Sequence, residues 1–104
     1  MGKYRVEVSE PAENDLRDIV RYISGQLSSP MTALKMMDTI EEAIEDLTVM
    51  PQTCPFVTDE RLAMAGYHKL LEKNYIVFFT IDEKSKVVSV ERILYSRRDW
   101  RYIL

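Results

Sequence analysis

Several residue types are scarce in this 104-residue chain, and each scarcity excludes a class of protein. The single cysteine, Cys54, excludes a disulfide framework and a cysteine-based metal site. The chain contains no glycine-rich phosphate loop. No apolar run approaches the ~20 residues that cross a bilayer, and the opening residues KYRVEV match a strand pattern rather than a signal peptide. We therefore expect a single domain spanning residues 1–104, soluble in the reducing cytoplasm, with no metal or cofactor.

The net charge of −3 conceals an uneven distribution along the chain. Residues 1–60 hold five Lys and Arg against twelve Asp and Glu, a net charge of −7. Residues 61–104 hold nine Lys and Arg against five Asp and Glu, a net charge of +4. The second half should therefore attract phosphates or an acidic partner, unless the acidic residues of the first half simply cover solvated helix faces.

The first half of the chain predicts one strand and two helices. Residues 4–8 alternate as a strand does, and a helix then begins at Glu10-Pro11, since proline suits the first helical position. Asp15 belongs to the charged face of this helix. A second helix begins after Ser29 and ends before Pro51, and the short link predicts an antiparallel hairpin. The apolar stripes are Ala12, Leu16, Ile19, Ile23 and Leu27, and Ala33, Met36, Met37, Ile40, Ala43, Ile44 and Leu47.

The second half predicts three consecutive strands. The segments YHKLLEK (67–73), YIVFFTI (75–81) and KVVSVERILY (86–95) are rich in β-branched and aromatic residues. Turns are expected at 82–85 and at Lys73-Asn74, where asparagine tolerates the left-handed conformation. Residues 51–65 show no period and should form an ordered loop, and the tail SRRDWR should hang from the last strand.

Together these elements predict an α+β fold with the order β-α-α-β-β-β and a short C-terminal helix or tail. The antiparallel sheet should carry the helical hairpin on one face, and the first strand should join the sheet edge-on. Val77, Phe79 and Ile81 alternate on one face of their strand, so they should meet the helical stripes. The stripe residues expected at this contact are Leu16, Ile19, Ile23, Ile40, Ile44 and Leu47.

The order and spacing of three segments, EPAENDLRDIVRYI, YHKLLEKNYIVFFTID and VERILYSRRDW, resemble the RelE/ParE superfamily of bacterial toxins. The resemblance covers nearly the whole chain. It implies a small toxin of a type II toxin–antitoxin module, an addiction or plasmid-stabilisation module in which a cognate antitoxin protein neutralises the toxin. It leaves the target open, because RelE-like members cut messenger RNA on the ribosome and ParE-like members poison DNA gyrase.

The resemblance also implies a candidate catalytic set for the endoribonuclease alternative: Tyr95, Arg97, Arg98 and Lys69. RelE-like cleavage is metal-free, because a ribose 2′-hydroxyl attacks the adjacent phosphate and the site supplies protons and cations. Tyr95 stands where several relatives have His or Tyr, and the arginines suit a phosphate clamp. RNA-cutting relatives carry an arginine at the start of the third strand, whereas this chain has Ile76, which cannot stabilise an anion.

Five further residues are candidates for binding a partner: His68, Arg92, Trp100, Arg101 and Tyr102. Histidine is the side chain that most often changes charge near neutral pH, but a lone strand histidine such as His68 is more often structural. The residues two positions before and after Arg92 in its strand are apolar, so Arg92 either pairs inside the protein or binds a partner. Trp100 and Tyr102 should cover the chain's own sheet or a partner.

Adjacent side chains on a strand point to opposite faces, so Lys69 or His68, but not both, can share a face with Tyr95. The missing cation at Ile76 and the overall acidity favour a ParE-like inhibitor that binds DNA gyrase as a protein. The alternatives are a ribosome-dependent mRNA endoribonuclease and a family member that lacks toxicity but still binds an antitoxin. None of these requires a cofactor or a membrane.

Overall fold

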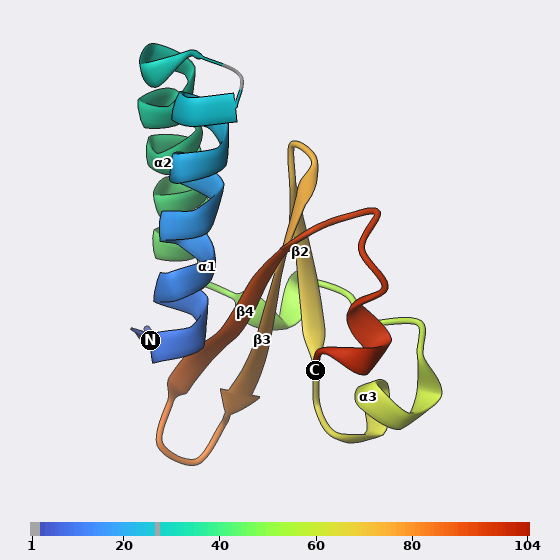
Figure 1. The fold of residues 1–104 in the computed structure, drawn as a ribbon. Coiled ribbons are helices and arrows are strands. Elements are labelled where there is room, and N and C mark those ends of the chain that lie inside the picture. The colour runs from blue at the N-terminus through green and yellow to red at the C-terminus, as the bar shows by residue number, and fades with distance from the viewer. Residues whose placement is uncertain (1–2, 27) are drawn as a thin grey trace.

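A computed structural model describes residues 3–26 and 28–104, and describes Arg101 by its backbone alone. Four strands form one sheet in the order β1-β4-β3-β2 (Figure 1). The strands are β1 (Arg5–Val8), β2 (His68–Glu72), β3 (Tyr75–Asp82) and β4 (Val87–Tyr95). The last three form an antiparallel meander, and β1 lies parallel to the first half of β4. The predicted element order and the edge position of the first strand are confirmed.

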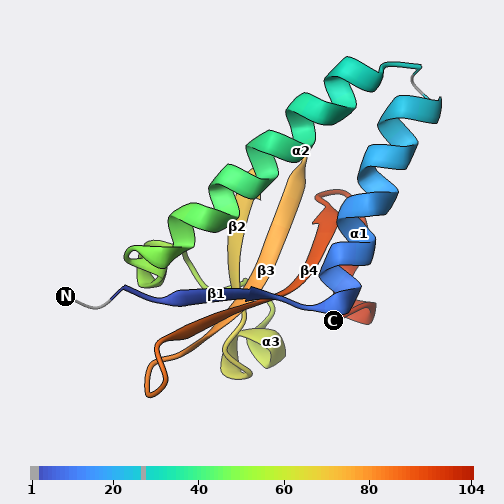
Figure 2. The same ribbon diagram turned by 90° about the vertical axis from the view of Figure 1, so that its left-hand side faces the viewer.

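Two helices, α1 (Glu10–Arg21) and α2 (Pro30–Glu45), run antiparallel beside one face of the sheet, as predicted (Figure 2). Ser9 caps α1, because its side chain accepts a hydrogen bond from the amide of Ala12 at 3.1 Å. Ser29 holds the N-cap position of α2. The first helix ends earlier than its apolar period indicates, since Tyr22–Gln26 form a π-helical turn. Leu27, the last member of the first stripe, lies outside the described residues.

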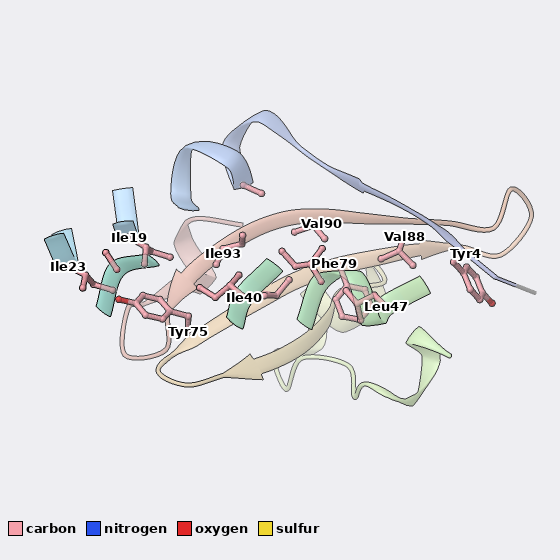
Figure 3. Packing of buried hydrophobic residues seen from close by; sticks show 14 residues of the cluster. Tyr4, Ile19, Ile23, Ile40, Leu47, Tyr75, Phe79, Val88, Val90 and Ile93 are labelled. Atoms are coloured by element: carbon pink, nitrogen blue, oxygen red, sulfur yellow. The ribbon is translucent and has the colours of Figure 1, made fainter. Parts of the chain in front are cut away.

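The main core lies between the helical hairpin and one face of the sheet, which we call the helix face (Figure 3). Leu16 and Ile81 pack at the margin of this core, and the other predicted contact residues are buried within it. Phe79 and Ile40 have no exposed surface. The match between a helical stripe of period 3.6 and a strand of period 2 is therefore confirmed. The buried members are Ile19, Ile23, Ile40, Ile44, Leu47, Val77 and Phe79.

The opposite side of the sheet, which we call the outer face, carries a second apolar cluster that includes Ile76, Phe78 and Leu94. The short helix α3 (Glu60–Met64) and the 3-10 turn η4 (Trp100–Tyr102) cover it (Figure 1). The ring of Trp100 packs on Phe78 with a centroid distance of 5.3 Å. Two expectations are corrected: residues 51–65 include a helix, and the C-terminal tail folds back because an apolar sheet face must be buried.

The turn between β2 and β3 differs in detail from the prediction. The sequence favours Asn74 for the left-handed conformation, whereas Lys73 adopts it with φ 56°. Lys73 is the first of the two turn residues, and one type of two-residue hairpin turn has a positive φ at its first residue only. The turn between β3 and β4 ends with Lys86 at φ 57°. Among the helices that the structure describes, none is long and apolar enough to cross a membrane.

Candidate functional site

A hollow of about 530 Å3 opens between the C-terminal half of α1 and the end of β4, and we call it the α1–β4 hollow. Within the described residues, β1 pairs with β4 as far as Val90, and the chain then turns at Ser9 into α1. On this side, the second half of β4 therefore lies beside the helix α1 instead of a strand (Figure 2). The polar and aromatic residues that line the hollow are Asp15, Asp18, Tyr22, Asn74, Tyr75, Tyr95 and Arg98.

A buried ion pair joins α1 to β4 at one side of the hollow. Arg92 donates from Nε and Nη2 to the two carboxylate oxygens of Asp15, at 2.7 and 2.9 Å, and the amide of Ile93 donates to the same carboxylate at 2.9 Å. The hydrogen bonds to Asp15 raise the pKa of the Arg92 guanidinium. Arg92 is thus held within the protein. Asp15, which the helical pattern places on the charged face, is buried instead because this arginine requires a partner.

A β-bulge in β4 decides which side chains reach the hollow. Phe78 pairs with Arg92 and Phe79 pairs with Val90, so Glu91 is an extra residue on β4. The extra residue shifts the alternation by one position. Ile93 therefore joins Val90 in the main core, and Tyr95, two positions after Ile93, also lies on the helix face.

Three tyrosines form an aromatic, hydroxyl-bearing wall around the hollow. The rings of Tyr75 and Tyr95 meet edge to face with centroids 5.9 Å apart. Burial raises the pKa of Tyr75, and the phenols of Tyr22 and Tyr95 raise it further. Tyr75 is therefore protonated at neutral pH and able to donate a hydrogen bond. Tyr22 and Tyr95 are 54% and 42% exposed, so a partner can reach both rings.

Arg98 lines the hollow from the turn that follows β4, and Arg97 precedes it on the same turn. Both side chains are exposed, and both also line a second hollow of about 480 Å3 that includes Asp59 and Trp100. Within residues 3–26 and 28–104, the guanidinium of Arg98 has no ion-pair partner. Tyr95 and Arg98 are thus brought together, with a cation available for a carboxylate or a phosphate.

Lys69 and Ile76 lie on the outer face, away from Tyr95. Lys69 pairs with Phe78, and Ile76 pairs with Leu94. Directly paired residues share a face of the sheet, and Phe78, Ile76 and Leu94 all belong to the outer cluster. The candidate catalytic residues are therefore divided between two faces, with Lys69 across the sheet from Tyr95.

His68 is buried in a stack of aromatic rings at the far end of β2. Its ring lies between Phe56 and Phe79, with centroid distances of 4.1 and 5.3 Å, and Nδ1 lies 2.8 Å from the carbonyl oxygen of Cys54. Since a carbonyl accepts, Nδ1 carries the hydrogen. His68 shares the helix face with Tyr95 but pairs with Phe79, four residues or about 13 Å along β3 from Tyr75. It holds residues 54–56 against the sheet.

The C-terminal binding candidates have different surroundings. Trp100 is half-buried on the outer cluster, so it covers the chain's own sheet. Tyr102 is 86% exposed. The side chain of Arg101 lies outside the described residues. Over the part of the chain that the structure describes, no group of three or more His, Cys, Asp or Glu side chains is placed to hold a metal ion.

Three residues of the site escaped the sequence reasoning: Asp15, Tyr22 and Tyr75. A signal existed for Asp15. The residues two positions before and after Arg92 are apolar, and an arginine in such surroundings requires a carboxylate from another element. Nothing in the sequence indicated that Tyr22, Tyr75 and Tyr95 would meet. They lie far apart in the chain, and no local sequence pattern predicts the bulge that brings Tyr95 towards Tyr75.

Comparison with protein families gives one match. A family model described as "ParE toxin of type II toxin-antitoxin system, parDE" matches residues 6–100. Among curated proteins, none matches this chain in sequence.

Several solved structures resemble the fold. The chromosomal ParDE toxin–antitoxin system from P. aeruginosa aligns with a TM-score of 0.74 at 20% identity, covering 91% of this chain and 98% of that chain. The toxin–antitoxin complex RelBE2 from Mycobacterium tuberculosis aligns at 0.67 and 17% identity, covering 89% and 98%. A mutant of the E. coli toxin RelE in the free state aligns at 0.66 and 12% identity, covering 97% and 92%. At these identities the likeness establishes the fold.

Proposed function

Because the chain belongs to the family of ParE toxins of type II toxin–antitoxin systems, we propose that it arrests growth by binding DNA gyrase as a protein. The family match over residues 6–100 supports a ParE-like rather than a RelE-like target, and the ParDE system is among the structural neighbours. On this proposal the toxin forms an interface and carries out no reaction of its own.

The division of the candidate catalytic residues is the observation that carries this proposal. RNA cleavage requires proton-transferring groups and cations at one phosphate. Lys69 lies on the outer face, Tyr95 lies on the helix face, and Arg92 is bound to Asp15. Ile76 is buried in the outer cluster, where an arginine could not reach the phosphate beside Tyr95. Tyr95 and Arg98 suit an interface better than a ribonuclease site.

The exposed aromatic residues support a protein partner. Tyr22 and Tyr95 flank the α1–β4 hollow, and Tyr102 projects from the C-terminal turn. Tyrosine and arginine are enriched among the residues that contribute most to protein–protein binding, since they combine a large apolar area with hydrogen-bonding groups. Arg98 lines the same hollow as Tyr22 and Tyr95, and Arg97 precedes it in the chain.

We propose that the cognate antitoxin binds with an acidic, amphipathic segment along the helical hairpin and the basic C-terminal half. A hollow of about 490 Å3 lies between α1 and α2. Its apolar wall is Leu16, Val20 and Met37, and its charged rim holds two arginines and two glutamates, namely Arg17, Arg21, Glu13 and Glu41. An amphipathic helix fits such a groove with its apolar face inward. ParDE, RelBE2 and an archaeal RelE-RelB complex from Pyrococcus horikoshii are toxin–antitoxin assemblies, which supports a protein partner of this kind.

Induced expression in a bacterial host tests the target, with two measurements made on the same culture. Primer extension detects cuts in messenger RNA, and plasmid DNA is examined for gyrase cleavage complexes and for loss of supercoiling. We expect DNA breaks with intact messenger RNA. Ribosome-dependent cuts in messenger RNA without DNA breaks would overturn the proposal.

Tyr95→Phe separates the two mechanisms further, because it removes the hydroxyl and keeps the ring. A nuclease that used this phenol would lose roughly 10²–10³ in rate. On our proposal the variant still arrests growth. Tyr102→Phe is the matched control, since it removes a hydroxyl from an exposed ring outside the hollow. Western blotting and circular dichroism establish that both variants accumulate and fold.

A further inference from the structure

The second half of β2 is an open strand edge. β2 lies at one side of the sheet, with β3 as its neighbour (Figure 2). On its other side, the amide of Lys69 donates to the carbonyl of Pro55 at 2.9 Å, and Phe56 forms an isolated bridge with His68. This short segment covers the first half of the edge. The chain before it forms the 3-10 turn η3 (Pro51–Thr53), and nothing in the described residues pairs with β2 on this side beyond Lys69.

Leu71 presents its backbone groups on this uncovered side. Successive residues of a strand alternate in direction, and the Lys69 amide points away from β3, so the amide and the carbonyl of Leu71 point away from β3 as well. Within residues 3–26 and 28–104, neither group has a hydrogen-bond partner. Leu71 is 63% exposed, so another chain can reach both groups. One donor and one acceptor on the same residue are what an antiparallel neighbour uses to pair.

A hollow of about 310 Å3 lies beside this edge, between β2 and the C-terminal end of α2, and we call it the α2–β2 hollow. Leu70 and Glu72 line it from the strand, and Val49 and Met50 line it from the segment that follows α2. The side chains of Val49 and Met50 are largely exposed. Exposed apolar side chains beside an open strand edge form a surface that an extended segment of another protein can cover.

The charge around the α2–β2 hollow is negative. Glu42 lies in the last turn of α2, Asp46 directly follows the helix, and Glu72 lines the same hollow from β2. In the part of the chain that the structure describes, none of these three carboxylates has an ion-pair partner. The C-terminal end of a helix is itself negative, and the last turn of α2 holds no basic residue. A lysine or arginine of a partner would therefore be attracted by both the carboxylates and the helix dipole.

A second copy of this chain does not suit the edge. Symmetric antiparallel pairing centred on Leu71 would place Lys69 opposite Lys73 of the second copy at both ends of the pairing. Like charges directly opposite each other destabilise a strand pair. The carboxylates of the two α2–β2 hollows would also approach each other. The edge therefore fits a partner of opposite charge.

We propose that the toxin meets its target at this edge, where an extended, basic segment of DNA gyrase adds to β2 as an antiparallel strand. An apolar residue of the segment lies opposite Leu71 on the outer face, and a neighbouring lysine or arginine lies opposite Glu72 on the helix face. Gyrase binds DNA, and proteins that neutralise phosphates carry exposed Lys and Arg. The acidic segment of the antitoxin would be repelled here. The inference rests on the proposed function, because it takes gyrase as the target.

Hydrogen–deuterium exchange measured by mass spectrometry tests the strand directly, on the toxin alone and with purified DNA gyrase. We expect the Leu71 amide, in the peptide that spans β2, to exchange at least about 10-fold more slowly with gyrase, since a new hydrogen bond protects it. The Val8 amide is the matched control at the other edge of the sheet, because the Ser9 amide donates to Val90 and alternation therefore points Val8 outward on β1. Protection at Val8 without protection at Leu71 would overturn the proposal.

Leu71→Pro removes the amide that the added strand uses. Proline is tolerated on an edge strand where the N–H faces solvent, so this variant should keep its pairing with β3. In titration calorimetry it should bind gyrase at least about 10-fold more weakly, because a carbonyl of the partner loses its donor. Leu71→Ala keeps the amide and should weaken binding less than Leu71→Pro. Val8→Pro makes the same change at the other edge and should alter the affinity less than about 2-fold. Equal affinities for Leu71→Pro and Val8→Pro would contradict the proposal.

Asp46→Lys and Glu45→Lys test the charge at the α2–β2 hollow. The two residues are neighbours, both are exposed, and both variants change the net charge equally. Asp46 lines the α2–β2 hollow, whereas Glu45 lines a different hollow beside β1. We expect Asp46→Lys to weaken gyrase binding about 10-fold and Glu45→Lys to weaken it less than about 3-fold. Equal losses for the two variants would show general charge attraction and contradict a basic segment at this hollow.

The experiments separate this inference from the proposed function. If gyrase does not bind the unmodified toxin, the target assignment fails and the strand addition fails with it. If gyrase binds, but Leu71 exchanges as fast as before and Leu71→Pro and Asp46→Lys bind normally, the strand addition alone is refuted. Circular dichroism of each variant excludes a loss of folding as the cause of weak binding. Should Leu71→Pro not fold, the exchange of Leu71 in the unmodified toxin and the affinity of Asp46→Lys decide the question.

Discussion

Removal of the Asp15 carboxylate should destabilise the protein more than any other single change on α1 outside the apolar stripe. Asp15 lies in the middle of the helix, and its side chain is 10% exposed. It is the point at which α1 is hydrogen-bonded to the second half of β4. Asp15→Ala raises the helix propensity of this position, so any loss of stability reports on the lost contacts.

The magnitude follows from three hydrogen bonds and one charge. Two hydrogen bonds come from Arg92 and one from the amide of Ile93. Removal of one partner of a fully buried ion pair costs about 3–5 kcal/mol, because the other charge remains buried. The side chain of Arg92 is 25% exposed, so water restores part of its solvation. We therefore expect Asp15→Ala to lower the free energy of unfolding by about 2–4 kcal/mol.

Urea unfolding followed by circular dichroism measures this change, with Asp18→Ala as the matched control. Asp18 lies one turn further along α1, and its pair with Arg21 is exposed at 3.4 Å, so its removal should cost less than about 0.5 kcal/mol. A double variant, Asp15→Ala with Arg92→Met, removes the stranded charge and should be more stable than Asp15→Ala alone. A loss for Asp15→Ala no larger than for Asp18→Ala would refute the reasoning.

Three further predictions concern the two clusters and the hollow. Ile44→Ala should cost roughly 2–5 kcal/mol, because Ile44 is buried in the main core; a loss below about 0.5 kcal/mol in urea would contradict the phase of α2. Ile76→Arg should lower the free energy of unfolding by at least about 2 kcal/mol, because it places a charge in the outer cluster. The control Ile76→Leu should cost less than about 1.5 kcal/mol. Equal melting temperatures for the two variants would be inconsistent with the burial of Ile76. The pKa of Tyr75 is higher in the folded protein than its unfolded value of about 10. Tyr75 therefore stabilises the folded state below about pH 10, and this contribution is lost as the pH rises through the folded pKa. Tyr75→Phe should therefore reduce the fall in stability above about pH 10 in urea melts, and identical falls in both proteins would argue against it.

Periodicity predicted the elements whose stability depends on one apolar face. The stripes that contain Ile19 and Ile40 required a partner surface, and Val77 and Phe79 supplied it with the period of a strand. These predictions succeeded because the spacing of apolar residues within one helix or strand decides which face is buried. That spacing can be read directly from the sequence. The edge position of β1 followed from the same reasoning.

The site depended on features that spacing does not display. The bulge at Glu91 reverses the alternation of β4, so Tyr95 lies on the helix face beside Tyr75 and not on the outer face with Lys69. A bulge is fixed by the register of two strands, which is a tertiary property. The burial of Asp15 likewise follows from the position of Arg92 on another element, and helical periodicity alone places Asp15 among solvated charges.

The early end of β1 and the α1–β4 hollow have one structural origin, the corner at Ser9. The Ser9 amide ends the pairing of β1 by donating to Val90, and its hydroxyl donates to the carbonyl of Glu91 at 2.8 Å while accepting from the first turn of α1. β1 therefore stops after four residues beside a strand of nine. An unpaired strand edge favours aggregation. Here α1 covers the part of β4 that β1 does not reach, since Asp15 accepts a hydrogen bond from the amide of Ile93 and Ile93 is buried.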